Sequence, residues 1–257
     1  MDTALNAKRW LVSADRQPAL PRIFLFPHGG GAAAEYIRWG RDLPGLEVNA
    51  IQLPGRGTRL REPAVTSMRE LVAQVVDAVP FGGPAGRRRF SFFGHSLGAL
   101  VAYEVCVALR TAGKPLPERL VVSGFGAPSV PRTATAVHHL ADDDLIAEVD
   151  RRHGGFPPEV LADADLRHLL AGYLRADYQV LETYEYRQTA PLPVPIQVFG
   201  GHEDAIAVED LHAWRRHSTW PVPVRLFPGG HFYLRDQAAP VRRALAAALN
   251  DDLRKAA

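Results

Sequence analysis

The sequence predicts an α/β fold in which helices cover both faces of an open, mostly parallel and doubly wound sheet. Short apolar runs, rich in β-branched and aromatic residues, alternate along the chain with segments of helical periodicity. These runs are continuously apolar, as expected of parallel strands that are buried on both faces. The 257 residues, 47% of them hydrophobic, suffice for one large domain.

The predicted strands are short and are separated by helical segments. A first run adds an edge strand, and the later runs form the parallel part of the sheet. In chain order they are Trp10–Val12, Ile23–Phe26, Val48–Leu53, Phe90–Phe93, Leu120–Ser123, Ile196–Phe199 and Val224–Phe227.

Helices are predicted between the strands. Ser67-Met-Arg-Glu70 has the capping-box pattern, and the apolar residues from Leu71 to Val79 then follow helical spacing. Leu97–Leu109 forms the next helix, with leucine and valine along one side. Ala238–Leu253 is expected to close the chain as an alanine-rich helix.

One long segment, between the strands Leu120–Ser123 and Ile196–Phe199, contains no clear strand. Three parts of it have helical character: Asp142–Val149, Pro158–Ala162 and Asp165–Tyr186. We expect a single domain over residues 1–257, with a helical lid insertion at approximately 133–190. It would cover the carboxyl ends of the strands, where ligands bind in such sheets. A plain helical crossover is the alternative.

The composition excludes several classes of protein. A net charge of +2, from 30 basic and 28 acidic residues, gives no sign of a nucleic-acid partner. The single cysteine, Cys106, excludes an intramolecular disulfide and fits a reducing compartment. No run approaches the ~18–20 apolar residues of a membrane span, and the first residues lack the apolar core of a signal peptide. We therefore expect a cytoplasmic protein without a membrane partner.

Gly94-His-Ser-Leu-Gly98 fits the nucleophile-elbow pattern G-x-S-x-G between a predicted strand and a predicted helix. The glycines leave room for strand and helix to approach each other around a strained serine. Ser96 is thus the candidate nucleophile. The backbone N–H of Leu97, at the start of the helix, is a candidate donor to an oxyanion.

A serine hydroxyl needs a base, and His231 is the candidate among the ten histidines. It lies in "FPGGHFYL", just after the strand Val224–Phe227 and so at the same sheet edge as Ser96. His95 is not expected to act as the base despite its position beside the serine. His212 and His217 fall in a polar helical stretch and are expected to be solvated.

The acid that orients the base is predicted to be Asp204. It lies in "VFGGHEDAI" after the strand Ile196–Phe199, which agrees with the chain order serine, acid, histidine. Glu203 and Asp210 are the competing carboxylates.

A second oxyanion donor is expected in "FLFPHGGGAA", after the strand Ile23–Phe26. The backbone N–H of Gly29 is preferred and that of Gly30 is the alternative. The glycine run does not have the spacing of a nucleotide-binding loop, and it lacks a P-loop lysine. Neither His138 nor His139 has neighbours spaced as metal ligands, so no metal or other cofactor is expected.

The chain resembles the type II thioesterases, stand-alone members of the α/β-hydrolase superfamily that accompany polyketide and non-ribosomal peptide synthases. "FLFPHGGGAA" is similar to that family's F-P-H-A-G-G loop, and "IQLPGRGTRLREP" to its P-G-R-x-x-R-x-x-E-P segment. "FFGHSLGALVAYEV", "VFGGHED" and "FPGGHFYL" resemble the elbow, acid loop and histidine loop. Two residues depart from the pattern: Gly29 stands where Ala is usual, and Leu97 where Met is usual.

The resemblance implies an α/β-hydrolase fold and Ser-His-Asp hydrolysis of acyl thioesters from the phosphopantetheine arm of acyl or peptidyl carrier proteins. Such an enzyme clears stalled or misprimed chains in antibiotic biosynthesis, takes acyl-CoA or acyl-pantetheine as small substrates, and is expected to be monomeric. Arg56, Arg59 and Arg61 are expected either to meet an acidic carrier or to belong to a solvated basic loop or to internal ion pairs.

Other functions remain open from the sequence. A carboxylesterase or lipase that acts on oxygen esters uses the same residues, and a non-catalytic scaffold is a further alternative. A malonyl acyltransferase is disfavoured because Ala99 stands where that class has Glu. Aromatic residues of the predicted lid are expected to line an acyl pocket or to form the lid core; they are Phe156, Tyr173, Tyr178 and Tyr184.

Overall fold

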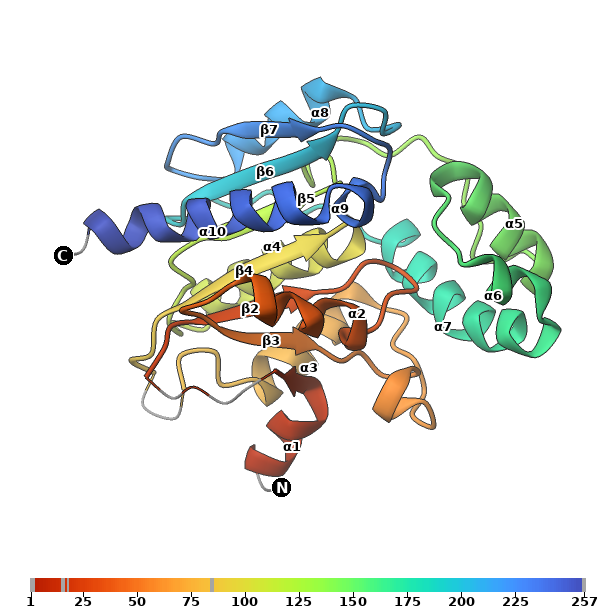
Figure 1. Cartoon of the computed structure of the whole chain (residues 1–257), viewed down its shortest axis with the longest axis horizontal. Helices are drawn as coiled ribbons and strands as arrows, with labels where there is room; N and C mark the ends of the chain where they lie inside the picture. Colours follow the sequence, from red (N-terminus) through yellow and green to blue (C-terminus); the bar gives the residue numbers. More distant parts are fainter. Residues whose placement is uncertain (1–2, 15–16, 18, 84–85, 256–257) are drawn as a thin grey trace.

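The computed structural model describes residues 3–14, 17, 19–83 and 86–255, so both ends of the predicted 1–257 domain lie outside the described residues. One seven-stranded sheet runs through the molecule in the order β1-β3-β2-β4-β5-β6-β7 (Figure 1). Only β1 is antiparallel to its neighbour, so the predicted α/β fold is confirmed. The strands are β1 Leu11–Ser13, β2 Arg22–Phe26, β3 Glu47–Ile51, β4 Phe90–His95, β5 Leu120–Ser123, β6 Ile196–Gly201 and β7 Val224–Phe227.

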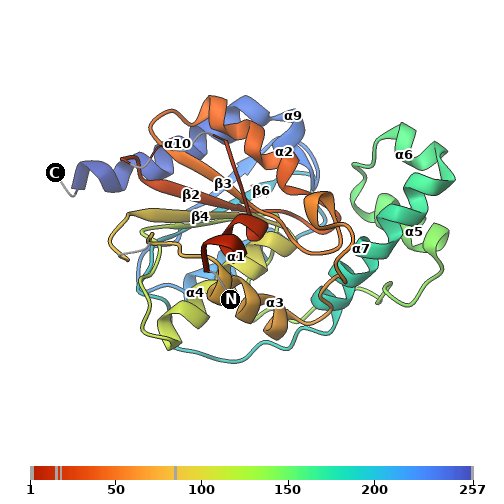
Figure 2. The same ribbon diagram turned by 90° about the horizontal axis from the view of Figure 1, so that it is seen from below.

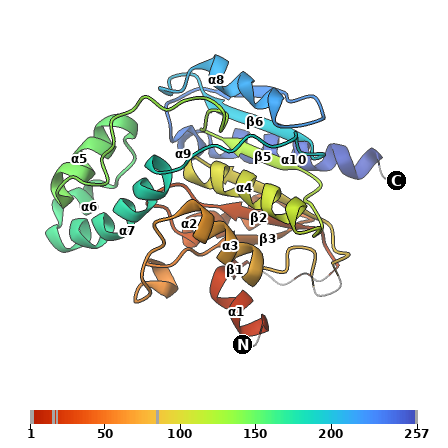
Figure 3. The ribbon, with the colours of Figure 1, turned by 180° about the vertical axis from the view of Figure 1, so that it is seen from behind.

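Helices cover both faces of the sheet. Figure 2 shows α2, α9 and α10 on one side, and α1, α3 and α4 on the other; α3 and α4 are in front of the sheet in Figure 3. The helices are α1 Thr3–Trp10, α2 Ala33–Ile37, α3 Met68–Ala78, α4 Leu97–Thr111, α5 Asp142–His153, α6 Pro158–Ala162, α7 Ala164–Glu182, α8 Val208–His212, α9 Tyr233–Asp236 and α10 Ala238–Lys255, with 3-10 turns η1 Arg38–Asp42, η2 Gly57–Arg59 and η3 Ala213–Arg216.

The central strands supply side chains to two separate cores. In β2, Phe24 and Phe26 pack into the core beneath α3 and α4, while Ile23 and Leu25 pack into the core beneath α2 and α10. All of β2 is buried, which explains why its sequence reads as a continuous apolar run. Each such side chain contributes about 1.5–3 kcal/mol through its burial.

The predicted capping box and one predicted helix end need correction. Ser67 occupies the N-cap of α3, but its side chain makes no capping hydrogen bond. Glu70 instead accepts a hydrogen bond from Gln74, so burial of the apolar face must hold the helix. Helix α7 ends at Glu182 rather than at Tyr186, and Tyr184 beyond it donates a hydrogen bond to Glu104 of α4.

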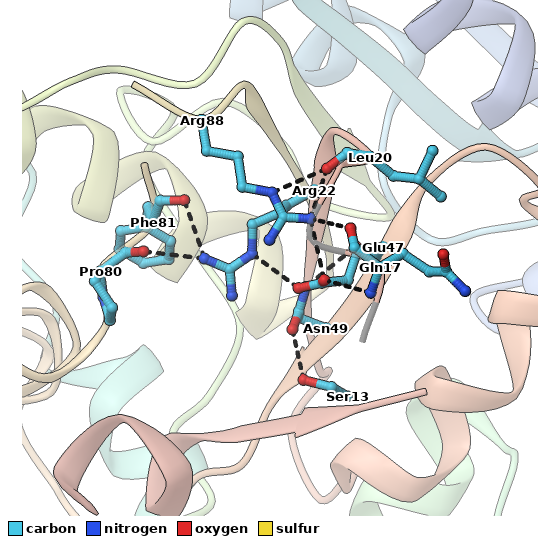
Figure 4. Close-up of polar contacts among 9 residues, drawn as sticks. All are labelled: Ser13, Gln17, Leu20, Arg22, Glu47, Asn49, Pro80, Phe81 and Arg88. Carbon is cyan, nitrogen blue, oxygen red and sulfur yellow. Dashed lines mark hydrogen bonds and ion pairs between the residues drawn. The ribbon is translucent and has the colours of Figure 1, made fainter. Parts of the chain in front are cut away.

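The end of the sheet at which the parallel strands begin is held by a polar network around Glu47 (Figure 4). The Glu47 carboxylate pairs with Arg22 at 3.2 Å and with Arg88 at 3.0 Å, and it accepts the backbone N–H of Gln17. Arg89 forms an ion pair with Glu118. Arg88 and Arg89, just before β4, thus hold the end of the sheet opposite to the nucleophile elbow.

Helices α5, α6 and α7 form an insertion between β5 and β6, and Figure 1 shows them beyond the arrowheads of the strands. They have a small core of their own, built from Val137, Leu145, Ile146, Val149, Leu170, Ala171, Leu174 and Tyr178. In the described part of the chain, none of the helices combines the length and the apolar character that a membrane span requires.

His217 is buried, contrary to the expectation that it is solvated. Only 2% of it is exposed, and its ring nitrogens contact the Tyr103 hydroxyl at 3.0 Å and the Ser129 hydroxyl at 2.9 Å. Burial, with Arg216 nearby, lowers the pKa of His217 to about 4. His212 is exposed as expected. The short 3-10 turn η3 rotates His217 inward, which a helical pattern does not reveal.

We predict that His217 contributes a pH-dependent part of the stability. Its pKa is lower in the folded protein than its ordinary value of 6.5, so the unfolded chain takes up the proton first as the pH falls. The contribution is therefore present near pH 7 and is lost between pH 6.5 and about 4. Urea denaturation should show His217→Gln to be less stable by about 1–2 kcal/mol at pH 7, with a smaller difference at pH 5.

The matched control is His212→Gln at the exposed position, which should leave the free energy of unfolding unchanged at both pH values. A difference between wild type and His217→Gln that stays constant from pH 7 to pH 5 would contradict this role.

Candidate active site

Ser96 lies at the sharp corner between β4 and α4. Its φ of 54° and ψ of −122° make it the one non-glycine with positive φ among the described residues. Such a backbone conformation costs on the order of 1–3 kcal/mol and persists only where the surroundings enforce it. The Ser96 N–H donates to the Ser123 carbonyl at 2.8 Å, which anchors the corner to β5.

Gly94 and Gly98 make the corner possible. A Cβ on Gly94 would lie 2.1 Å from the Gly98 carbonyl oxygen, and a Cβ on Gly98 would lie 2.0 Å from the Phe26 carbonyl oxygen. Any side chain at these positions would push α4 away from β2 and β4. The glycines of the elbow are therefore required by close backbone contact.

His231 and Asp204 are held together at the same sheet edge. The Nδ1 atom of His231 lies 2.9 Å from Oδ2 of Asp204, and both side chains are buried. The loops that carry them are joined by a hydrogen bond from the Glu203 N–H to the Gly229 carbonyl. The Glu203 side chain is exposed, and Asp210 lies beside Gly126 instead. Of the three carboxylates considered from the sequence, Asp204 is the one that contacts the imidazole.

His95 is fully buried and points into a structural network. Its Nδ1 contacts the Ser123 hydroxyl at 2.9 Å, and that hydroxyl contacts the Tyr233 hydroxyl at 2.5 Å. Burial, followed by the nearby His231, lowers the pKa of His95 well below its ordinary value. A neutral imidazole with these partners ties β4 to β5 and α9.

Among the three glycines of the loop after β2, one has a backbone N–H without an acceptor in the described part of the chain. The Gly30 N–H donates to Oδ2 of Asp177 at 2.7 Å, and the Gly31 N–H donates to the His28 carbonyl at 2.9 Å. Among the described residues no acceptor takes the N–H of Gly29 or that of Leu97. The alternative donor Gly30 is thus already occupied, and Gly29 is the one left to face a ligand.

A cavity of about 310 Å³ lies between these loops and the insertion. Ser96, His231, Gly29 and Gly30 line its floor. The insertion supplies a largely apolar wall, formed by Val149, Phe156, Val160, Leu166, Leu169, Leu170, Tyr173, Tyr178 and Leu181. Tyr184 does not line it. Such a wall suits an apolar chain attached to the group that reacts at Ser96.

Four polar residues of the cavity were missed from the sequence: His28, Glu35, His153 and Arg235. His28 contacts the Tyr36 hydroxyl at 2.7 Å, and burial, reinforced by Arg235, lowers its pKa well below the ordinary value. The His153 ring, from the insertion, lies 4.5 Å from that of His231, and burial lowers its pKa to about 4. Arg235 pairs with Glu35 and donates to the Gly155 carbonyl. His28 stands in the FLFPHGGGAA motif, which could have signalled it. No motif contains His153 or Arg235, which only the fold brings to the cavity.

The basic segment after β3 turns inward at two of its three arginines. Arg56 pairs with Asp177, and Arg59 pairs with Glu62 and lies over the Trp10 ring. Arg61 is exposed. Internal ion pairs therefore account for Arg56 and Arg59. In the described ranges no cluster of three or more His, Cys, Asp or Glu is arranged to hold a metal ion.

Comparison with known proteins finds a thioesterase family model and relatives from biosynthetic pathways. A model of the thioesterase domain matches residues 21–250. The gramicidin S biosynthesis protein GrsT of Aneurinibacillus migulanus is 35% identical over 232 residues, 89% of each chain. The thioesterase PikA5 of Streptomyces venezuelae is 40% identical over 218 residues, 84% of this chain and 76% of PikA5.

Solved structures of thioesterases are also similar to this chain. The thioesterase RedJ from the prodiginine pathway of Streptomyces coelicolor has a TM-score of 0.82 at 34% identity, covering 92% of this chain and 90% of its own. The type II thioesterase BorB from the borrelidin cluster has a TM-score of 0.80 at 31% identity, covering 94% and 96%.

The elbow glycines lead to a stability prediction. Gly98→Ala should prevent folding or destabilise the protein by more than about 4 kcal/mol, because the new methyl group would overlap the Phe26 carbonyl. Gly172→Ala in α7 is the matched control, since its Cβ would meet open space, and it should raise stability by about 0.5–1 kcal/mol. Thermal melting of both variants checks this, and a well-folded Gly98→Ala would disprove the close contact.

The Asp204–His231 contact leads to a second prediction. Asp204→Asn should slow labelling of Ser96 by a fluorophosphonate by about 10²–10⁴-fold, because the amide no longer favours the imidazole tautomer that accepts the serine proton. Glu203→Gln, at the exposed neighbouring carboxylate, should label within twofold of wild type. Equal effects of the two substitutions would remove Asp204 from this role.

Proposed function

The chain belongs to the thioesterase family, and we propose that it hydrolyses acyl thioesters carried on the phosphopantetheine arm of acyl or peptidyl carrier proteins. In this role it removes stalled or misprimed chains during polyketide or non-ribosomal peptide biosynthesis. The observation that carries the proposal is that Ser96 and the Asp204-paired His231 line one cavity with an apolar wall. Of its relatives, GrsT is named for gramicidin S biosynthesis and RedJ for the prodiginine biosynthetic pathway, which supports the proposal.

Ser96 is the proposed nucleophile. The Nδ1 of His231 is engaged by Asp204, which leaves Nε2 to take the serine proton as Oγ attacks the thioester carbonyl. The carbonyl electron pair moves to oxygen, and the N–H groups of Leu97 and Gly29 stabilise the resulting oxyanion. Asp204 stabilises the imidazolium that forms.

Collapse of the tetrahedral intermediate breaks the carbon–sulfur bond. The proton on His231 passes to the departing pantetheine thiol, and an acyl-enzyme remains on Ser96. Water then attacks this ester with His231 again as base, which releases the free acid and regenerates the serine. The apolar wall supports the acyl chain throughout, and its contacts exclude water from the chain.

We predict that Ser96→Ala lowers turnover of acyl-pantetheine and of acyl-loaded carrier protein by about 10⁴–10⁶-fold. Mass spectrometry of the released acid, with thiol titration, measures it. Ser67→Ala is the control, because the Ser67 side chain makes no capping hydrogen bond, and it should keep wild-type turnover. Near wild-type release by Ser96→Ala would contradict the proposal.

The same assay separates the thioester from the oxygen ester. Acyl-pantetheine and a p-nitrophenyl ester of equal chain length should differ in kcat/KM in favour of the thioester. A large preference for the oxygen ester would assign the chain to carboxylester hydrolysis instead.

A further inference from the structure

A buried ion pair joins the insertion to the segment after β3. The Arg56 guanidinium pairs with the Asp177 carboxylate through two contacts, Nη1 to Oδ2 and Nη2 to Oδ1, each 2.6 Å long. The side chains are 3% and 4% exposed, and Arg56 also lies over the Tyr173 ring at 4.8 Å. Neither residue touches Ser96, His231 or Asp204 by any described hydrogen bond.

Both members of the pair also hold the glycine loop. Oδ2 of Asp177 accepts the Gly30 N–H at 2.7 Å, and Nη1 of Arg56 donates to the Gly31 carbonyl at 3.2 Å. Gly30 has a φ of +76°, and a Cβ there would lie 3.0 Å from Leu174 of α7. The loop is thus clamped from the insertion helix, through polar groups that are shielded from water.

The two contacts of the clamp limit which glycine N–H is free to meet a ligand. With Gly30 bonded to Asp177 and Gly31 bonded to His28, Gly29 is the one of the three glycines whose N–H has no acceptor among the described residues. We propose that Arg56 and Asp177 are positioning residues that hold the Gly29 N–H toward the oxyanion, so that the oxyanion hole is complete only while α7 lies against the loop. This inference rests on the assignment of Ser96 and Gly29 under the proposed function.

Stability alone does not account for the pair. Replacing a buried ion pair by apolar residues of similar volume is often neutral or stabilising, whereas removing one partner is costly. A second ion pair of α7, between Arg175 and Asp142 of α5, is 2.6 Å long and makes no contact with the glycine loop. Its side chains are more exposed, at 29% and 37%, and it provides a control for support of the insertion without support of the loop.

The test compares two double variants. Arg56→Met with Asp177→Leu removes the clamp without leaving an unpaired buried charge, and Arg175→Met with Asp142→Leu removes the control pair. The probe is a long-chain alkyl trifluoromethyl ketone, to which Oγ of Ser96 adds. The serine proton goes to His231 and the carbonyl electron pair becomes an alkoxide. The corresponding trifluoromethyl alcohol has the same chain and forms no oxyanion.

We expect the clamp variant to fold, to keep its KM for acyl-pantetheine within about threefold, and to lose about 10²-fold in kcat, as when one oxyanion donor is removed. Its affinity for the ketone should fall about 10²-fold while its affinity for the alcohol is unchanged. Asp177→Asn, which retains an acceptor for the Gly30 N–H, should recover part of the ketone affinity. The control variant should match wild type for both inhibitors.

Ketone affinity of the clamp variant within threefold of wild type would overturn the inference, as would an equal loss in the control variant. The result is separable from the proposed substrate. If wild type binds the ketone tightly but leaves acyl-pantetheine intact, the proposed substrate is wrong, and the comparison of the two double variants still decides the role of Arg56 and Asp177.

Discussion

The contact between α4 and the ends of β2 and β4 is the constraint on which the rest of the site depends. Gly94 and Gly98 let the backbone of α4 lie against the backbone of β4 and against Phe26 at the end of β2. This close contact holds Ser96 in a strained conformation. Because parallel strands end at one edge, the loops after β2, β6 and β7 arrive around the same serine. Each loop then brings one residue of the proposed site to this edge: Gly29, Asp204 and His231.

Several imidazole rings gather around His231. His28, His95 and His153 all lie within the same buried cluster, and burial lowers the pKa of each. Neutral imidazoles pack against one another without mutual repulsion, whereas several imidazolium groups in that space would repel. The Asp204 carboxylate, with Oδ2 2.9 Å from Nδ1 of His231, is the acidic group in contact with that imidazole.

The insertion has two physical roles in this arrangement. Its apolar residues form a separate small core and also the wall of the cavity. Its polar residues reach the body of the protein at the glycine loop, where Asp177 contacts Gly30 and Arg56. Helix α7 thus covers the cavity and also contacts the glycine loop. Under our proposal, movement of α7 would therefore change the hydrogen-bond donors that face the substrate carbonyl.

The sequence by itself determined the strands, the elbow at Ser96 and the loops of Asp204 and His231, because each depends on residues close together in the chain. Apolar runs and flanking glycines can be recognised in the sequence without knowing which distant residues they contact. Tertiary structure alone decided that His217 is buried, that Gly30 is occupied and that Arg56 pairs with Asp177. Arg56 and Asp177 are 121 positions apart. Asp177 lies within the helix α7, and nothing near it in the sequence indicates a partner. It meets Arg56 only once α7 has packed against the sheet edge.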